Sequence, residues 1–61
     1  MQPEEEAHSR LTSVISVCEH ELAGLEALGD PQLALIIERM RAFHLDLVAA
    51  LEGLERAGGE S

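Results

Sequence analysis

The feature that most limits how this chain can fold is one break between two segments of seven-residue apolar repeat. The break is the run Leu28-Gly29-Asp30-Pro31. Gly29 can adopt the left-handed conformation that ends a helix, Asp30 is a favourable N-cap, and Pro31 suits the first position of the next helix. Because the connection is so short, the sequence predicts two antiparallel helices that lie side by side.

The two predicted helices fill nearly the whole chain. The predicted boundaries divide a single domain, residues 1–61, into a first helix at 3–28, a turn at 29–30, a second helix at 31–57 and a frayed tail at 58–61. Pro3 and the glutamates that follow it place negative charge at the positive end of the first helix dipole. A later start, with Ser9 as N-cap, is the alternative. Gly58 and Gly59 are expected to end the second helix.

Apolar residues in both segments alternate steps of four and three, the spacing of a and d positions in a left-handed bundle. These positions, called the seam below, are Leu11, Ile15, Cys18, Leu22 and Leu25 in the first helix and Leu33, Ile37, Met40, His44, Leu47, Leu51 and Leu54 in the second. Folding the chain at the turn pairs the two seams in layers, with Cys18 opposite Met40 and Ile15 opposite His44. This agreement between two separate patterns supports the hairpin.

A third apolar column runs beside each seam: Ala7, Val14 and Leu28 in the first helix, and Ile36, Phe43, Ala50 and Ala57 in the second. Two helices cannot bury three columns each, so Val14, Ile36, Phe43, Val48 and Ala50 would face water in a monomer. We therefore expect an all-α fold in which the antiparallel hairpin dimerises into a four-helix bundle. The expected dimer or partner interface is the seam without Leu33, together with Val14, Ile36 and Phe43. The alternative is that another protein supplies the missing helices.

Composition narrows the possible partners. Acidic residues outnumber basic ones by 12 to 4, and the formal net charge is -8. Such a surface repels phosphate, so we expect no nucleic acid partner. No apolar run approaches the roughly 20 residues that span a bilayer, and the acidic start does not resemble a signal peptide. With a single cysteine, which excludes an internal disulfide, these features predict a cytoplasmic protein without membrane contact.

Two seam residues carry side chains capable of chemistry. For His44 the plain interpretation is a core histidine, and the alternatives are a pH switch or a metal ligand. Its expected seam neighbours are apolar, no carboxylate is expected beside it, and the residue three positions before it is Arg41, so His44 is not part of a Glu-x-x-His pair. Cys18 has acidic sequence neighbours and is expected to be a buried filler rather than a nucleophile. We therefore predict no catalytic residue, no metal and no cofactor, and hence no enzyme.

The segment 20–24, HELAG, resembles the H-x-L-K-G motif of histidine phosphotransfer domains. Those domains are four-helix bundles with an exposed histidine that is phosphorylated, so the resemblance implies phosphotransfer at His20. The lysine of the motif is Ala23 in this chain, and Glu19 and Glu21 would repel a phosphoryl group. An exposed polar position on the first helix is the alternative.

The order of heptad seam, tight turn with aspartate, and heptad seam resembles the Rop family of plasmid copy-number proteins. Members are dimers of short antiparallel hairpins that bind paired RNA loops, and the likeness in pattern covers most of the chain. It implies a dimeric bundle, and RNA binding through polar and basic residues of the first helix. Here that helix offers Arg10 alone against six glutamates, so the charges argue against RNA binding.

The sequence predicts protein binding without catalysis, in a small acidic adaptor, anti-regulator or co-chaperone. The expected partner is a protein with a basic or apolar helical face that docks as a helix. Arg39 and Arg41 are possible anchors for a partner carboxylate, and a solvated surface is the alternative. His8 follows Glu4 by one turn and is expected to contact it within the helix.

Overall fold

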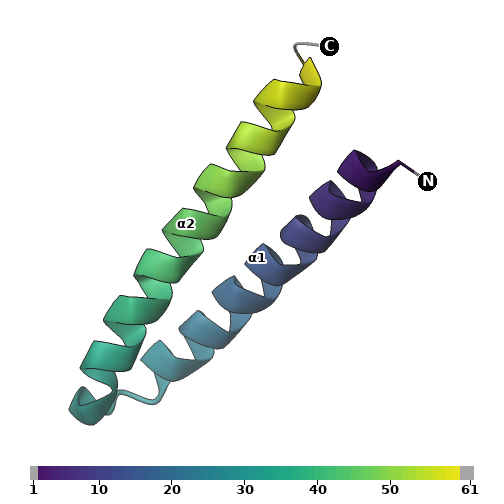
Figure 1. The fold of residues 1–61 in the computed structure, drawn as a ribbon. Coiled ribbons are helices and arrows are strands. Elements are labelled where there is room, and N and C mark those ends of the chain that lie inside the picture. Colours follow the sequence, from purple (N-terminus) through teal and green to yellow (C-terminus); the bar gives the residue numbers. More distant parts are fainter. Residues whose placement is uncertain (1, 60–61) are drawn as a thin grey trace.

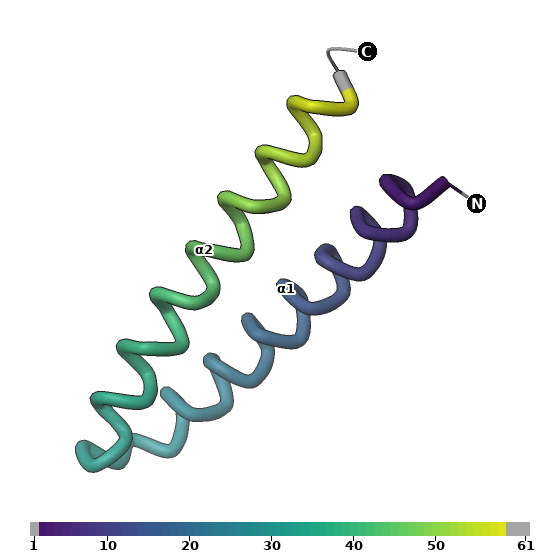
Figure 2. The backbone as a smooth tube through the Cα atoms, in the orientation of Figure 1, coloured from purple at the N-terminus to yellow at the C-terminus, as the bar shows by residue number. Residues whose placement is uncertain are grey.

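The computed structural model describes residues 2–59 as two long helices joined by a short turn (Figure 1). Helix α1 spans Pro3–Ala27, the short 3-10 helix η1 spans Pro31–Leu33, and α2 spans Ala34–Gly59. The described part of the chain contains no strand. The chain doubles back at the turn so that α2 runs antiparallel to α1 (Figure 2). The predictions of an all-α fold and of a helical hairpin are confirmed.

The turn depends on Gly29 and Asp30. Gly29 has φ of 65°, the left-handed region that disfavours residues with a Cβ atom, and it is the one positive φ among the described residues. Its N–H donates to the Glu26 carbonyl oxygen at 3.2 Å and closes the last turn of α1. The Asp30 side chain accepts a hydrogen bond from the Gln32 N–H at 2.9 Å and caps the next helix. Both residues therefore act in the turn as the sequence predicted.

The start of the second helix differs from the prediction. The Leu33 N–H donates to the Asp30 carbonyl oxygen at 3.0 Å, a bond that spans three residues and winds this turn as 3-10 helix. The α-helical part of the segment therefore begins at Ala34 rather than Pro31. At the preceding end, Leu28 is the cap that follows α1 and lies outside the helix.

The end of the second helix also differs from the prediction. The expected stop at Gly58 is wrong, because α2 continues to Gly59. Glycine commonly ends a helix by adopting a left-handed backbone, and Gly58 does not have a positive φ. Residues 60–61 of the expected frayed tail lie outside the described residues. The first helix begins at Pro3, so the alternative start at Ser9 is not adopted.

The seam lies between α1 and α2. Its members are half-buried, except that Cys18 is fully buried with 7% of its surface exposed. The Cys18 Sγ atom lies 4.0 Å from the carbonyl oxygen of Met40, so this layer forms in the predicted register. Because Cys18 is the one buried residue among those described, the seam is a thin core that still borders solvent.

The hairpin is a single layer of helices. Its Cα atoms extend over 46 × 18 × 11 Å, so the hairpin is long and narrow. The radius of gyration is 14.3 Å, against roughly 10–11 Å for a compact domain of this length. The helices separate toward the chain termini (Figure 1). Two broad faces therefore remain open, one on each side of the seam.

Replacing Gly29 with alanine should lower the free energy of unfolding by about 1–2 kcal/mol, because a Cβ atom disfavours the left-handed backbone. Gly29→Asn should cost less, since asparagine tolerates that conformation. Urea unfolding followed by circular dichroism, at one fixed protein concentration, measures both changes. Equal stability of wild type and Gly29→Ala would contradict this turn.

Candidate interaction surface

The two open faces of the hairpin carry different residues. In an antiparallel pair the heptad e positions of both helices share one face, and the g positions share the other. The first face, called the polar flank, consists of Glu5, Thr12, Glu19, Glu26, Ala34, Arg41, Val48 and Glu55. The second face, called the apolar flank, is the third column defined above: Ala7, Val14, Leu28, Ile36, Phe43, Ala50 and Ala57. Glu21 is the one charged residue among the g positions of the two helices.

An ion pair joins the helices across the polar flank near the turn. The Arg41 guanidinium donates to the Glu26 carboxylate, and both side chains are about half exposed. Arg41, a predicted anchor for a partner, is thus already paired within the chain. Arg39, the other predicted anchor, has no ion-pair partner among the described residues.

His44 lies in the seam, and 21% of its side chain is exposed. The expectation that no carboxylate lies beside it is wrong, because its Nε2 is 3.1 Å from the Glu19 Oε2. Glu19 stands on the polar flank next to Cys18, and its side chain reaches across the edge of the seam. The sequence held a signal for this contact: Glu5, Glu19 and Glu26 recur at multiples of seven beside the seam. The spacing of the seam residues alone does not reveal this contact.

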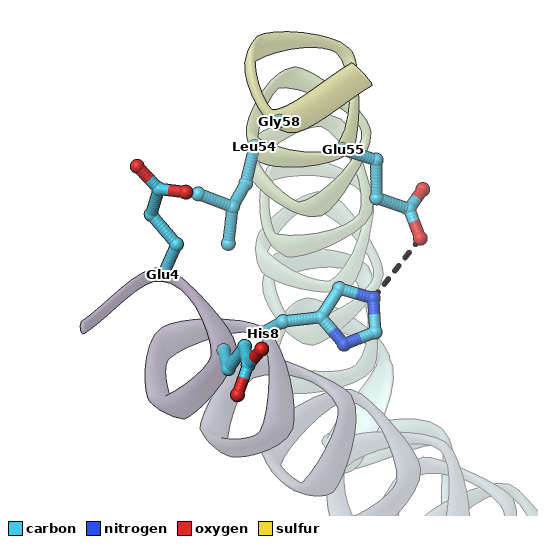
Figure 3. A pocket seen from close by; sticks show the side chains of 6 residues that line it. Glu4, His8, Leu54, Glu55 and Gly58 are labelled. Atoms are coloured by element: carbon cyan, nitrogen blue, oxygen red, sulfur yellow. Dashed lines mark hydrogen bonds and ion pairs between the residues drawn. The ribbon is translucent and has the colours of Figure 1, made fainter. Parts of the chain in front are cut away.

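His8 also contacts a glutamate of the other helix. Its Nε2 is 3.1 Å from the Glu55 Oε2 (Figure 3), so the expected contact within α1 to Glu4 is wrong. The two side chains are about half exposed. Leu54 extends toward α1 beside this contact, and an open hollow of about 300 Å³ lies there. The histidine therefore bridges the helices where they separate, near the chain termini.

No group of three potential metal-ligating His, Cys, Asp or Glu side chains occurs in the part of the chain that the structure describes. The Cys18 thiol is buried in the seam. His20 is exposed on the outer side of α1, where the heptad places position f. Arg10, the one cation of α1, pairs with Glu6 one turn away at 2.9 Å. The structure thus brings His8 and His44 to glutamates and leaves His20 apart from the seam.

The apolar flank has large side chains in contact with solvent. The exposed fractions are 45% for Val14, 69% for Leu28, 52% for Ile36 and 53% for Phe43. All the cross-helix ion pairs of the described residues lie on the other side of the seam. Of the residues expected to face water, Val48 alone is half-buried, because it belongs to the polar flank rather than to this one. Of the two flanks, the apolar flank therefore presents more large apolar side chains to solvent.

The total surface of the chain is large for its mass. It exposes 4777 Å², whereas a compact protein of 6.6 kDa exposes about 3,900 Å². The excess of about 900 Å² is close to the roughly 800 Å² that one partner buries in a standard protein interface. The hairpin alone thus leaves exposed about as much surface as one further interface covers.

No helix among the described residues combines the length and the apolar character needed to cross a bilayer. Comparisons of the chain with protein-family models, with curated proteins and with solved structures find no match.

Removing the ion pair on the polar flank should affect stability only slightly, because its charges are solvated. A double-mutant cycle with Glu26→Ala and Arg41→Ala should give a coupling energy below about 1 kcal/mol. The coupling energy should fall further in 1 M salt, because the Debye length is then about 3 Å and exposed charges are screened from each other. A salt-independent coupling of several kcal/mol would show instead that the pair is shielded from water.

Proposed function

We propose that this chain is a small acidic protein-binding module without catalytic activity, acting as a homodimer in which two hairpins complete a four-helix bundle. The observation that carries this proposal is the exposed apolar flank of a single-layer fold. Helices are stable when their apolar faces lie against another layer. A second hairpin supplies such a layer and shields the third apolar column.

The remaining surface of such a dimer is strongly acidic, because each chain carries a net charge of -8. An acidic surface attracts a basic partner and raises the rate of encounter. Binding would follow the helix-docking mode, in which an amphipathic helix of the partner packs its apolar side against exposed apolar residues. The exposed side chain of Leu35 on the outer surface of α2 offers such a contact beside the acidic residue Glu38.

Sedimentation equilibrium should give a mass of twice the 6.6 kDa chain at low micromolar concentration. In the same experiment Leu47→Asp should be monomeric and unfolded, because it places an unpaired charge in the middle of the seam. A helical wild-type monomer at this concentration would overturn the homodimer.

Peptide binding tests the preference for a basic partner. Two amphipathic helical peptides share one apolar face and carry either lysine and arginine or glutamate on the other. The basic peptide should bind more tightly, with an affinity that falls as salt is raised. Equal binding of both peptides, or binding of neither, would contradict the proposed recognition.

Structured RNA should not bind at physiological salt, because the acidic surface repels phosphate and Arg10 is the only cation of α1. Fluorescence anisotropy with a labelled duplex and a kissing-loop RNA provides the measurement. A salt-sensitive complex of micromolar affinity would favour the Rop-like alternative instead.

A further inference from the structure

Four charged residues lie within or beside the apolar flank. They occupy heptad positions c and g, which point to the same side of the seam as Val14 and Phe43. The four are Arg10 and Glu21 on α1, and Arg39 and Asp46 on α2. All four are exposed. Within the described residues Glu21, Arg39 and Asp46 have no ion-pair partner.

These four charges alternate in sign around the face. Toward the termini, α1 carries the cation Arg10, which also pairs with Glu6 one turn away, and α2 carries the anion Asp46. Toward the turn the signs are exchanged, with the anion Glu21 on α1 and the cation Arg39 on α2. The four sum to zero, so the full net charge of -8 is carried by residues at other positions. The apolar flank is therefore the neutral side of a strongly acidic chain.

An alternating pattern of this kind is complementary to itself. Two copies that meet face to face are related by a two-fold axis lying in the plane between them. An axis parallel to the helices exchanges α1 with α2, and an axis across the helices exchanges the turn end with the terminal end. In either case each of the four charges meets a charge of opposite sign on the second copy. Arg39 then lies toward the partner's Glu21 in the first case and toward the partner's Asp46 in the second.

We infer that the apolar flank is the self-association surface, that its occupant is a second copy of this chain, and that its four border charges select the face-to-face orientation. The inference rests on the proposed homodimer and adds its face and its charge pairing. Two chains of charge -8 repel each other, so they approach at least cost through a neutral face. A basic partner, in contrast, is attracted to the acidic positions outside this face. The excess exposed area also matches what one chain buries in a standard interface.

A matched pair of substitutions on α2 tests the face. Phe43 is 53% exposed on the apolar flank, and Leu45 is 67% exposed on the outer surface of the same helix. Phe43→Glu should raise the dimer dissociation constant by about tenfold or more, because it places a charge in the interface. Leu45→Glu should leave the constant within about threefold of wild type, a change of less than 1 kcal/mol. The reverse order, or equal effects, would overturn the choice of face.

Charge reversal tests the pairing and remains informative if Phe43→Glu does not fold. Arg39 is exposed and unpaired within the described chain, so Arg39→Glu should leave the hairpin intact and weaken only the dimer. Adding Glu21→Arg should restore association if the axis runs along the helices, and adding Asp46→Arg should restore it if the axis runs across them. Restoration by one of the two supports the inference and identifies the axis. Failure of both, with helicity retained, overturns the charge pairing.

The outcome for wild type separates this inference from the proposed function. A wild-type monomer in sedimentation equilibrium means that the homodimer itself is wrong. A wild-type dimer that Phe43→Glu leaves intact, with its circular dichroism unchanged, means that the homodimer stands and another face forms it.

Discussion

The left-handed backbone of Gly29 and the side-chain cap of Asp30 set the register in which α1 meets α2. A short turn leaves the helices no freedom to slide, so the seam residues meet in layers, as Cys18 and Met40 do. The same register decides which residues flank the seam on each side. Ion pairs between the helices and the arrangement of exposed apolar groups therefore both depend on two residues of the turn.

That register divides the hairpin into two chemically different faces. Three glutamates of the two helices reach histidine or arginine across the polar flank and hold the helices together at their exposed edge. Such contacts are individually weak in water, so they orient the helices more than they stabilise them. Among the described residues the opposite face has no equivalent contacts, and it presents valine, isoleucine and phenylalanine to solvent. A single layer with one apolar face lacks the second layer against which helices pack, which is why we propose a second copy.

The distribution of charge is compatible with the proposed self-association of so acidic a chain. A net charge of -8 on 61 residues would oppose any contact in which the charges were spread evenly. Here the charges bordering the apolar flank cancel and alternate, while the acidic excess lies elsewhere. One side is thereby suited to a second copy and the rest to a basic partner. The two proposed binding activities do not compete for the same surface.

The sequence by itself determined the helices, the turn and the seam. Their signals are local: a seven-residue apolar period, a glycine that permits positive φ, and an aspartate that caps the next turn. The continuation of α2 through Gly58 and the 3-10 turn at Pro31 were not predicted, because small differences in backbone energy decide them. Only the tertiary structure showed that Glu19 and Glu55 reach His44 and His8. Such contacts depend on how far a flexible side chain extends from one helix to another, and residue spacing along one helix does not specify that reach.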